Sequence, residues 1–313
     1  MSLERALALV AAAPRSGYPN PTVGAVVVAP DGATLGEGVS EPAGGRHAEV
    51  VALDAAGSRA DGATLFVTME PCAHHGRTAP CVDAILASGI SRVVAACPDP
   101  SADAGGGAEA LRSAGVEVEL LDLPEGRTQN EAWRTWAARG RPYVVLKLAV
   151  SLDGRAVVPG RRWLTGETSR LRVHELRAGV DAVGVGMGTV RADAPRLDAR
   201  DVGATRQPRR LAFGRGPLPE GSGLELRPGS IEDELAALAA EGVQSLLLEG
   251  GPTIGAAFLA VGCVDRLLVF VAPVLAGDGP PMLGPLPAPL DLGRPDVEQV
   301  GDDVLLDWRL QDV

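Results

Sequence analysis

Aromatic residues are scarce in this chain and make up only 3% of its 313 residues. The hydrophobic cores must therefore be built mainly from Ala, Val and Leu. Long apolar runs are also missing, since none approaches the roughly 18 residues that a membrane-spanning helix needs. The acidic residue Glu4 comes early and no cleavage pattern follows it, which argues against a secretory signal. We therefore expect a cytoplasmic protein with no membrane partner.

Basic residues are fewer than acidic residues. The chain has 29 Lys and Arg against 40 Asp and Glu, which gives a formal net charge of −11. Such a surface repels a polyanion, because nucleic-acid binding depends on clustered cationic side chains. The charge balance therefore argues against a nucleic-acid partner. It favours a small-molecule substrate that binds in a locally basic pocket.

Cysteine and histidine are few, with four of each. So few cysteines fit a reducing compartment better than a disulfide scaffold. Cys97 and Cys263 are explained as buried core residues, since free cysteine is among the most buried residue types. The other two cysteines fall together with three of the four histidines within residues 47–81. This concentration indicates a site rather than scattered core residues.

The pattern in that stretch is typical of a catalytic zinc site. Glu49 follows His47 by two positions, and Pro71-Cys72 precedes Cys81. One imidazole and two thiolates give zinc three protein ligands and leave a fourth position for water. A glutamate beside them can carry protons between that water and an amine leaving group, as in the zinc deaminases of nucleobases. The spacing between the cysteines is longer than usual, and a structural zinc site or a chance grouping are the alternatives.

The length indicates two domains, because a single core stops growing at about 250–300 residues. A polar stretch over residues 122–141, with a predicted helix around Trp133 and Trp136, ends at Arg141-Pro142. The predicted domains therefore cover residues 1–141 and 142–313. Helices are predicted over residues 2–13, 47–56, 81–88, 109–114 and 167–178. Strands are predicted over residues 23–29, 33–39, 64–68, 92–96, 116–120, 143–150, 181–185, 210–213, 245–249, 265–271 and 304–310. This alternation predicts two α/β units.

Two glycine-rich segments of the second domain are predicted to be turns that follow strands. One covers residues 183–189 and the other covers residues 249–255. Glycine lets the backbone approach a phosphate closely, and the N-terminus of a following helix supplies N–H donors. Either turn would suit a dinucleotide pyrophosphate. Tight strand-to-helix turns without a ligand explain the pattern equally well.

Together the two halves resemble the bifunctional deaminase–reductase family of riboflavin biosynthesis, over nearly the whole chain. In the first half the resemblance is carried by residues 19–24, 47–50 and 70–81. The long spacing between the cysteines in the last of these segments is specific to this family. In the second half it is carried by residues 147–155, 163–166, 188–190 and 249–253.

For the first domain, the resemblance implies a three-layer α/β/α fold of the cytidine-deaminase type. The implied reaction is hydrolysis of the 2-amino group of 2,5-diamino-6-ribosylamino-4(3H)-pyrimidinone 5′-phosphate. The implied zinc ligands of the single Zn²⁺ are His47, Cys72 and Cys81, and Glu49 is the implied general acid and base. The implied substrate contacts are Asn20, which would orient the ring, and His74 and Arg77, which would lie near the phosphate.

For the second domain, the resemblance implies a fold similar to dihydrofolate reductase and NADPH-dependent reduction of the ribosyl group to ribityl. Lys147 is the candidate for neutralising the charge that develops on the hydride acceptor. The implied substrate contacts are Arg177, Leu197, Arg200 and Glu249. The implied cofactor contacts are Ala149, Trp163, Thr165, Thr189, Asp193, Gly250, Gly251, Pro252, Thr253 and Gly255. Family members tend to associate, so a homo-oligomer (a dimer or a tetramer) is expected.

A preference for NADPH over NADH needs a cation for the 2′-phosphate. Arg206, Arg209 or Arg210 could supply that charge, and a solvated loop explains the three arginines equally well.

The chain departs from the family pattern at three places. Asp193-Ala194-Pro195 stands for the usual Asp-Asp-Pro, Arg161-Arg162 replaces a small polar residue before Trp163, and Ser101 stands where asparagine is usual. The zinc pattern is intact. These changes motivate one alternative function, a paralogous aminopyrimidine deaminase of another pathway with an altered or impaired reductase domain.

Overall fold

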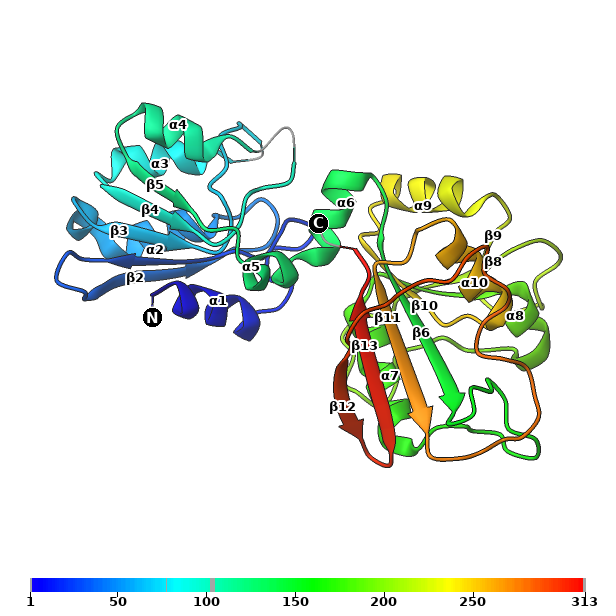
Figure 1. Ribbon diagram of the computed structural model, residues 1–313. Helices are drawn as coiled ribbons and strands as arrows, with labels where there is room; N and C mark the ends of the chain where they lie inside the picture. The colour runs from blue at the N-terminus through cyan, green and yellow to red at the C-terminus, as the bar shows by residue number, and fades with distance from the viewer. Residues whose placement is uncertain (1, 77, 102–104, 312–313) are drawn as a thin grey trace. The chain divides into compact units, whose positions relative to one another are not determined.

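The computed structural model describes residues 2–76, 78–101 and 105–311. The chain divides into two compact units, one ending at Arg139 and the other beginning at Gly140 (Figure 1). The boundary expected from the sequence, between Arg141 and Pro142, lies just beyond this point. Within the described residues, no helix is long and apolar enough to cross a membrane.

The first unit is built around a five-stranded sheet of order β2-β1-β3-β4-β5. β1 is antiparallel to β2 and β3, whereas β3, β4 and β5 run parallel. The strands are β1 Gly24–Val28, β2 Thr34–Val39, β3 Thr64–Val67, β4 Arg92–Ala95 and β5 Glu117–Leu120. The helices are α1 Ser2–Ala12, α2 Ala48–Ala56, α3 Cys81–Ala87, α4 Gly107–Ser113, α5 Pro124–Gln129 and α6 Glu131–Arg139, with a 3-10 turn η1 at Gly57–Ala60.

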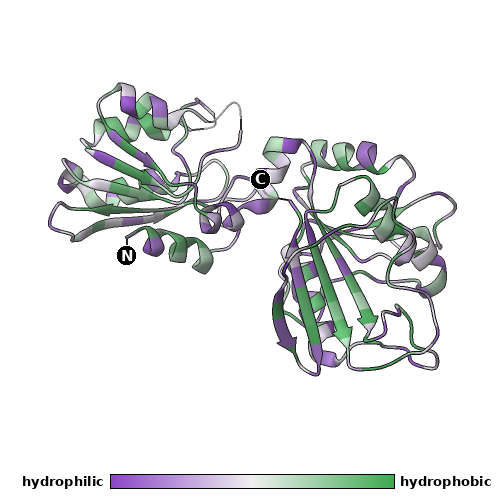
Figure 2. Cartoon of the chain, in the orientation of Figure 1, coloured by the Kyte–Doolittle hydropathy of each residue, from purple (hydrophilic) through white to green (hydrophobic). Residues whose placement is uncertain are grey.

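The two faces of this sheet are covered by different helices, because side chains alternate along each strand. Val27 of β1 belongs to a core shared with α2 and α3, which includes Ile85. Its neighbours Val26 and Val28 pack on the other face, against Ala6 of α1. Hydrophobic residues accordingly concentrate in the strands (Figure 2). The expected three-layer α/β/α arrangement is confirmed.

The second unit contains an eight-stranded sheet of order β12-β13-β11-β6-β10-β7-β8-β9. The strands from β11 to β9 run parallel, and β13 and β12 add antiparallel pairs at one edge. The strands are β6 Tyr143–Ser151, β7 Ala182–Gly186, β8 Arg209–Phe213, β9 Glu225–Arg227, β10 Ser245–Leu248, β11 Arg266–Ala272, β12 Asp296–Val300 and β13 Asp303–Arg309. The helices are α7 Glu167–Gly179, α8 Met187–Asp193, α9 Ile231–Ala240 and α10 Pro252–Ala260. The pattern had predicted neither α9 nor the short strands β9 and β12.

The core of the second unit lies where helices pack on the parallel strands. Phe258 of α10 meets Phe213 of β8 edge to face, with ring centroids 5.3 Å apart.

A buried ion pair stabilises the beginning of the second unit. Arg141 donates two hydrogen bonds, of 2.6 and 2.7 Å, to Asp265, whose side chain is fully buried. Asp265 also accepts a hydrogen bond of 2.8 Å from the backbone N–H of Val144 in β6.

The first glycine-rich segment is not the predicted turn. β7 extends to Gly186, and α8 begins at the next residue. These glycines make room for neighbouring side chains. A Cβ atom on Gly184 would lie 2.6 Å from Cε2 of Phe213, and one on Gly186 would lie 3.1 Å from Cβ of Ile254. The prediction of a turn was wrong. It explained these glycines by the approach of a phosphate to the backbone, whereas on this buried strand they leave room for neighbouring side chains.

Candidate active sites

Three side chains of the first unit meet beside the N-termini of α2 and α3. His47 immediately precedes α2, Cys81 is the first residue of α3, and Cys72 lies in the loop after β3. One ligand atom from each lies within 4.8 Å of the others. Among the described residues, this is the only such group of three or more His, Cys, Asp or Glu side chains.

The spacing of these atoms fits one zinc ion. Nδ1 of His47 lies 3.1 Å from Sγ of Cys81 and 3.5 Å from Sγ of Cys72. Zinc bonds of about 2.0 Å to nitrogen and about 2.3 Å to sulfur, at a tetrahedral angle, would separate such atoms by roughly 3.5 Å. The donor set and its geometry therefore suit Zn²⁺ with little rearrangement.

The sulfur atoms of the two cysteines share one proton, and Cys72 is the one that carries the negative charge. Hydrogen bonds from the Cys81 thiol and the His47 imidazole lower the pKa of Cys72 to about 4, against the cost of burial. The backbone N–H of Cys81 also points at the Cys72 sulfur, at 3.4 Å. The same pairing raises the pKa of Cys81, because the two sulfurs share one proton. A cation between the sulfurs would replace that proton.

Glu49 lies in the first turn of α2 and is only 4% exposed. Burial raises the pKa of its carboxyl group, and the nearby Cys72 thiolate adds to that shift. The carboxyl group also interacts with the Cys81 thiol. A carboxyl group with a raised pKa beside the metal ligands is suited to take up and release a proton.

The other ring nitrogen of His47 has a partner that the sequence did not single out. Oγ1 of Thr78 lies 3.3 Å from Nε2 of His47. A hydrogen bond on this side fixes the ring orientation and leaves Nδ1 for the metal. A cavity of about 390 Å³ opens next to the histidine, lined by Arg46, His47, Val50, Thr78, Ala79, Pro80, Asp83 and Ala84.

The implied substrate contacts of the first unit are less well defined. Asn20 and His74 are exposed, and neither belongs to the lining of this cavity. Arg77 lies outside the described residues.

The second unit holds a larger cavity of about 1080 Å³. It brings together nearly all of the reductase residues implied by the sequence: Lys147, Ala149, Trp163, Thr165, Arg177, Thr189, Asp193, Leu197, Arg200, Glu249, Gly250, Gly251, Pro252 and Thr253. Gly255 is the exception. It is buried in α10, where a Cβ atom would lie 3.0 Å from Cδ2 of Leu283. Its lack of a side chain therefore serves helix packing.

A buried charge cluster lies in the larger cavity. Arg177 of α7 donates two hydrogen bonds, of 2.5 and 2.9 Å, to Glu249 at the end of β10. Nζ of Lys147 lies 3.6 Å from the same carboxylate. Burial alone would raise the pKa of Glu249, but Lys147 and Arg177 lower it below its ordinary value. The cluster therefore keeps the Glu249 carboxylate charged in a sheltered place, next to Arg177 and Lys147.

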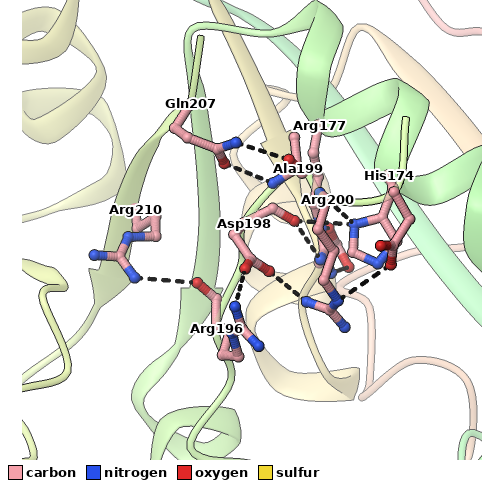
Figure 3. A network of polar contacts seen from close by, with 10 residues as sticks. His174, Arg177, Arg196, Asp198, Ala199, Arg200, Gln207 and Arg210 are labelled. Carbon is pink, nitrogen blue, oxygen red and sulfur yellow. Dashed lines mark hydrogen bonds and ion pairs between the residues drawn. The ribbon is translucent and has the colours of Figure 1, made fainter. Parts of the chain in front are cut away.

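A second network surrounds Asp198, on the segment that also carries Leu197 and Arg200 (Figure 3). The Asp198 carboxylate pairs with Arg200 and, at 2.7 Å, with Arg196. His174 of α7 is 8% exposed and lies 3.0 Å from the Asp198 carbonyl oxygen through Nδ1. Burial and the neighbouring Arg177 and Arg200 lower the pKa of His174, so the ring is neutral at pH 7.

The sequence reasoning missed His174. The available signal was its spacing: Arg170, His174 and Arg177 follow each other at helical intervals and all line the cavity. The arginines considered for a 2′-phosphate are engaged elsewhere. Arg206 pairs with Asp181 and Arg209 pairs with Glu225, and the lining of the cavity, as far as the chain is described, includes none of the three.

Two family models match this chain, one in each of its two units. Residues 2–97 match the cytidine and deoxycytidylate deaminase zinc-binding region, and residues 142–219 and 228–306 match the RibD C-terminal domain. The chain is 41% identical to the riboflavin biosynthesis protein RibD of Mycobacterium tuberculosis, over 92% of this chain and 91% of that protein. It is 39% identical to RibD of Aquifex aeolicus, over 97% and 96% respectively. The chain belongs to the RibD family.

Solved RibD structures agree with this assignment. RibD of Acinetobacter baumannii superposes with a TM-score of 0.83 at 34% identity, covering 98% of this chain and 97% of that chain. The deaminase/reductase of Thermotoga maritima gives a TM-score of 0.84 at 32% identity, with the same coverage. The likeness to RibD extends over both units. A paralogue of another pathway is therefore not favoured.

Proposed function

We propose that this chain catalyses two successive steps of riboflavin biosynthesis. The first is zinc-dependent hydrolytic deamination of 2,5-diamino-6-ribosylamino-4(3H)-pyrimidinone 5′-phosphate, and the second is NADPH-dependent reduction of the ribosyl side chain to ribityl. The observation that carries the proposal is the presence of two sites in one chain: the His47–Cys72–Cys81 cluster and the cavity around Lys147 and Glu249. The matching Thermotoga maritima protein is described as a diaminohydroxyphosphoribosylaminopyrimidine deaminase and 5-amino-6-(5-phosphoribosylamino)uracil reductase.

Deamination replaces a ring C–NH₂ bond by a C=O bond and releases ammonia. His47, Cys72 and Cys81 would hold the zinc ion, which would supply a water whose pKa is lowered toward about 7. Glu49 would take up the proton of the attacking water and deliver it to the departing amine. The burial of Glu49, which is 4% exposed, supports this role, because it raises the pKa of the carboxyl group and so favours proton uptake. Thr78 supports it by holding the His47 ring.

Reduction delivers a hydride to the carbon of the sugar that is bonded to nitrogen, and the sugar ring oxygen gains a proton as the ring opens. NADPH supplies the hydride. The Lys147 ammonium group, 3.6 Å from Glu249, is our candidate for stabilising the negative charge that develops on the acceptor. Arg177 and Arg200 line the same cavity and supply positive charge for the substrate phosphate. An acidic protein thus presents a locally basic pocket to an anionic substrate.

The variant Glu49→Gln tests the role of Glu49 in deamination. A single assay measures ammonia release and NADPH oxidation together. The variant should retain its zinc and lose about 10²–10⁴-fold in the rate of ammonia release, since a positioned acid–base group contributes about that much. Its reduction of the already deaminated compound should equal that of the unaltered protein. Ammonia release without NADPH oxidation in the unaltered protein would instead support the paralogue with an impaired reductase.

Three further properties belong to the proposal. A cytoplasmic location is supported by four cysteines that are all free. A dimer or tetramer is expected from the family resemblance, and light scattering of the purified chain measures it. The absence of a nucleic-acid partner is supported by the net charge of −11. Salt-sensitive binding to tRNA would contradict it.

A further inference from the structure

The backbone segment 194–201 forms one wall of the larger cavity. It carries Leu197 and Arg200, two of the implied substrate contacts. The segment belongs to no helix or strand. Something other than secondary structure must therefore hold it in place.

Three residues of this segment adopt backbone angles that side chains rarely accept. The φ angles are 42° at Ala194, 53° at Leu197 and 64° at Asp201. Such left-handed conformations persist only where the surrounding contacts impose them. The contacts of this segment therefore decide whether Leu197 and Arg200 stay where the cavity needs them.

Helix α7 supplies the contacts on one side. The carbonyl oxygen of Asp198 accepts a hydrogen bond of 3.0 Å from Nη1 of Arg177. It also lies 3.0 Å from Nδ1 of His174. His174 and Arg177 themselves line the cavity.

Gln207 supplies the contacts on the other side (Figure 3). Its Oε1 accepts a hydrogen bond of 2.8 Å from the backbone N–H of Ala199. Its Nε2 donates one of 2.7 Å to the carbonyl oxygen of the same residue. The Gln207 amide thus imitates a neighbouring β-strand. Ala199 is only 2% exposed, and in the described structure these two backbone groups have no other partner.

We propose that Gln207 is a positioning residue of the reductase site. It contacts neither the cavity nor its contents, and it acts by fixing the backbone that presents Leu197 and Arg200. This inference rests on the proposed reductase function. Loss of the Gln207 amide leaves two buried backbone groups unpaired, so the segment moves to find other partners.

Two variants separate the two hydrogen bonds. Gln207→Leu removes both. Gln207→Glu keeps an acceptor for the Ala199 N–H group but cannot donate to the Ala199 carbonyl oxygen. Gln299→Leu is the matched control, because Gln299 is also exposed and its amide also makes two hydrogen bonds to the backbone. Both are donated to carbonyl oxygens, those of Gly301 and Asp303, away from the cavity lining.

The expected result in Gln207→Leu is a KM for 5-amino-6-(5-phosphoribosylamino)uracil raised about tenfold, with kcat within about threefold, since binding geometry rather than chemistry is disturbed. The dissociation constant for NADPH and the rate of ammonia release should stay unchanged. Hydrogen exchange of the Ala199 amide should accelerate at least tenfold in the full chain. Gln207→Glu should raise KM similarly while the Ala199 amide keeps most of its protection. Gln299→Leu should change none of these quantities.

An unchanged KM together with unchanged exchange at Ala199 in Gln207→Leu would overturn the inference. An equal loss of NADPH affinity, ammonia release and substrate affinity would overturn it too, because it would show general destabilisation. If the unaltered chain reduces nothing with NADPH, the proposed function fails, whereas the exchange measurement still decides whether Gln207 holds Ala199.

Discussion

Arg177 and Glu249 form a two-point ion pair, with N···O distances of 2.5 and 2.9 Å, on the wall of the larger cavity. The pair joins α7 to the end of β10, two elements far apart in the sequence. It also fixes the carboxylate that Lys147 approaches to 3.6 Å. Lys147 is the proposed group for stabilising charge during reduction, so the ion pair of Arg177 with Glu249 also bears on where this side chain lies.

Replacement of Glu249 by glutamine should lower the free energy of unfolding at pH 7 by about 3–5 kcal/mol, because it leaves two buried cations without their counter-charge. The pKa of Glu249 is lowered on folding. Its contribution is therefore fully present above the unfolded value of about 4.3 and is lost as the pH falls through the lower folded value. Denaturant unfolding should show the variant and the unaltered protein converging below about pH 4.

Glu298→Gln is the control for this experiment, because Glu298 is largely exposed and lies on the edge strand β12. Its stability should stay within about 0.5 kcal/mol of the unaltered protein at pH 7. A Glu249→Gln variant that differs equally from the unaltered protein at pH 7 and at pH 3 would contradict the assigned ion pair.

Thr78→Val should weaken zinc binding by about 10–100-fold, because it removes the hydrogen bond that orients His47 through Nε2. Competition with a chromophoric chelator measures the affinity in the full chain. Thr78→Ser keeps the hydroxyl group and should bind zinc as the unaltered protein does. Equal affinities for the valine and serine variants would rule out an orienting role for this hydroxyl.

Gly184→Ala should cost about 1–3 kcal/mol of stability, since its Cβ atom would lie 2.6 Å from the ring of Phe213. Gly179→Ala is the matched change, because a Cβ atom there has no neighbour within 4 Å. It should be neutral or stabilising by up to about 1 kcal/mol. Denaturant unfolding compares the two. Full stability of Gly184→Ala with loss of NADPH binding would mean that this glycine serves a ligand.

Ala194→Gly should raise the midpoint of thermal unfolding by up to about 2–4 °C, because Ala194 ends α8 with a φ of 42° that glycine adopts without strain. Ala192 lies in the same helix with right-handed geometry, so Ala192→Gly should lower the midpoint. Thermal scans of both variants with the unaltered chain give the comparison. A fall in both would argue against the left-handed cap.

The zinc cluster could be predicted from the sequence because its chemistry is local. His47, Cys72 and Cys81 are ligand types with characteristic neighbours, and helix N-termini bring them together. The two α/β units followed from the alternation of apolar strands with helices. The family resemblance supplied the residues around the larger cavity, which a single sequence could not have grouped by spacing alone.

The misjudged residues depend on partners that no short pattern contains. Gly184 is explained by the ring of Phe213 on the neighbouring strand. Gln207 is explained by two backbone groups of Ala199, which any residue type at that position would offer. His174 gains its place from the carbonyl group of Asp198. Backbone carbonyl and N–H groups are alike whatever the side chain, so the sequence does not indicate which of them will be hydrogen-bond partners.

The pairing of Arg141 with the fully buried Asp265 determines where the second unit can be cut free of the first. A fragment that starts at Gly140 carries its own guanidinium group for that carboxylate. One that starts at Tyr143 does not, and should be less stable by about 3–5 kcal/mol. The true start of the reductase half therefore precedes its first strand.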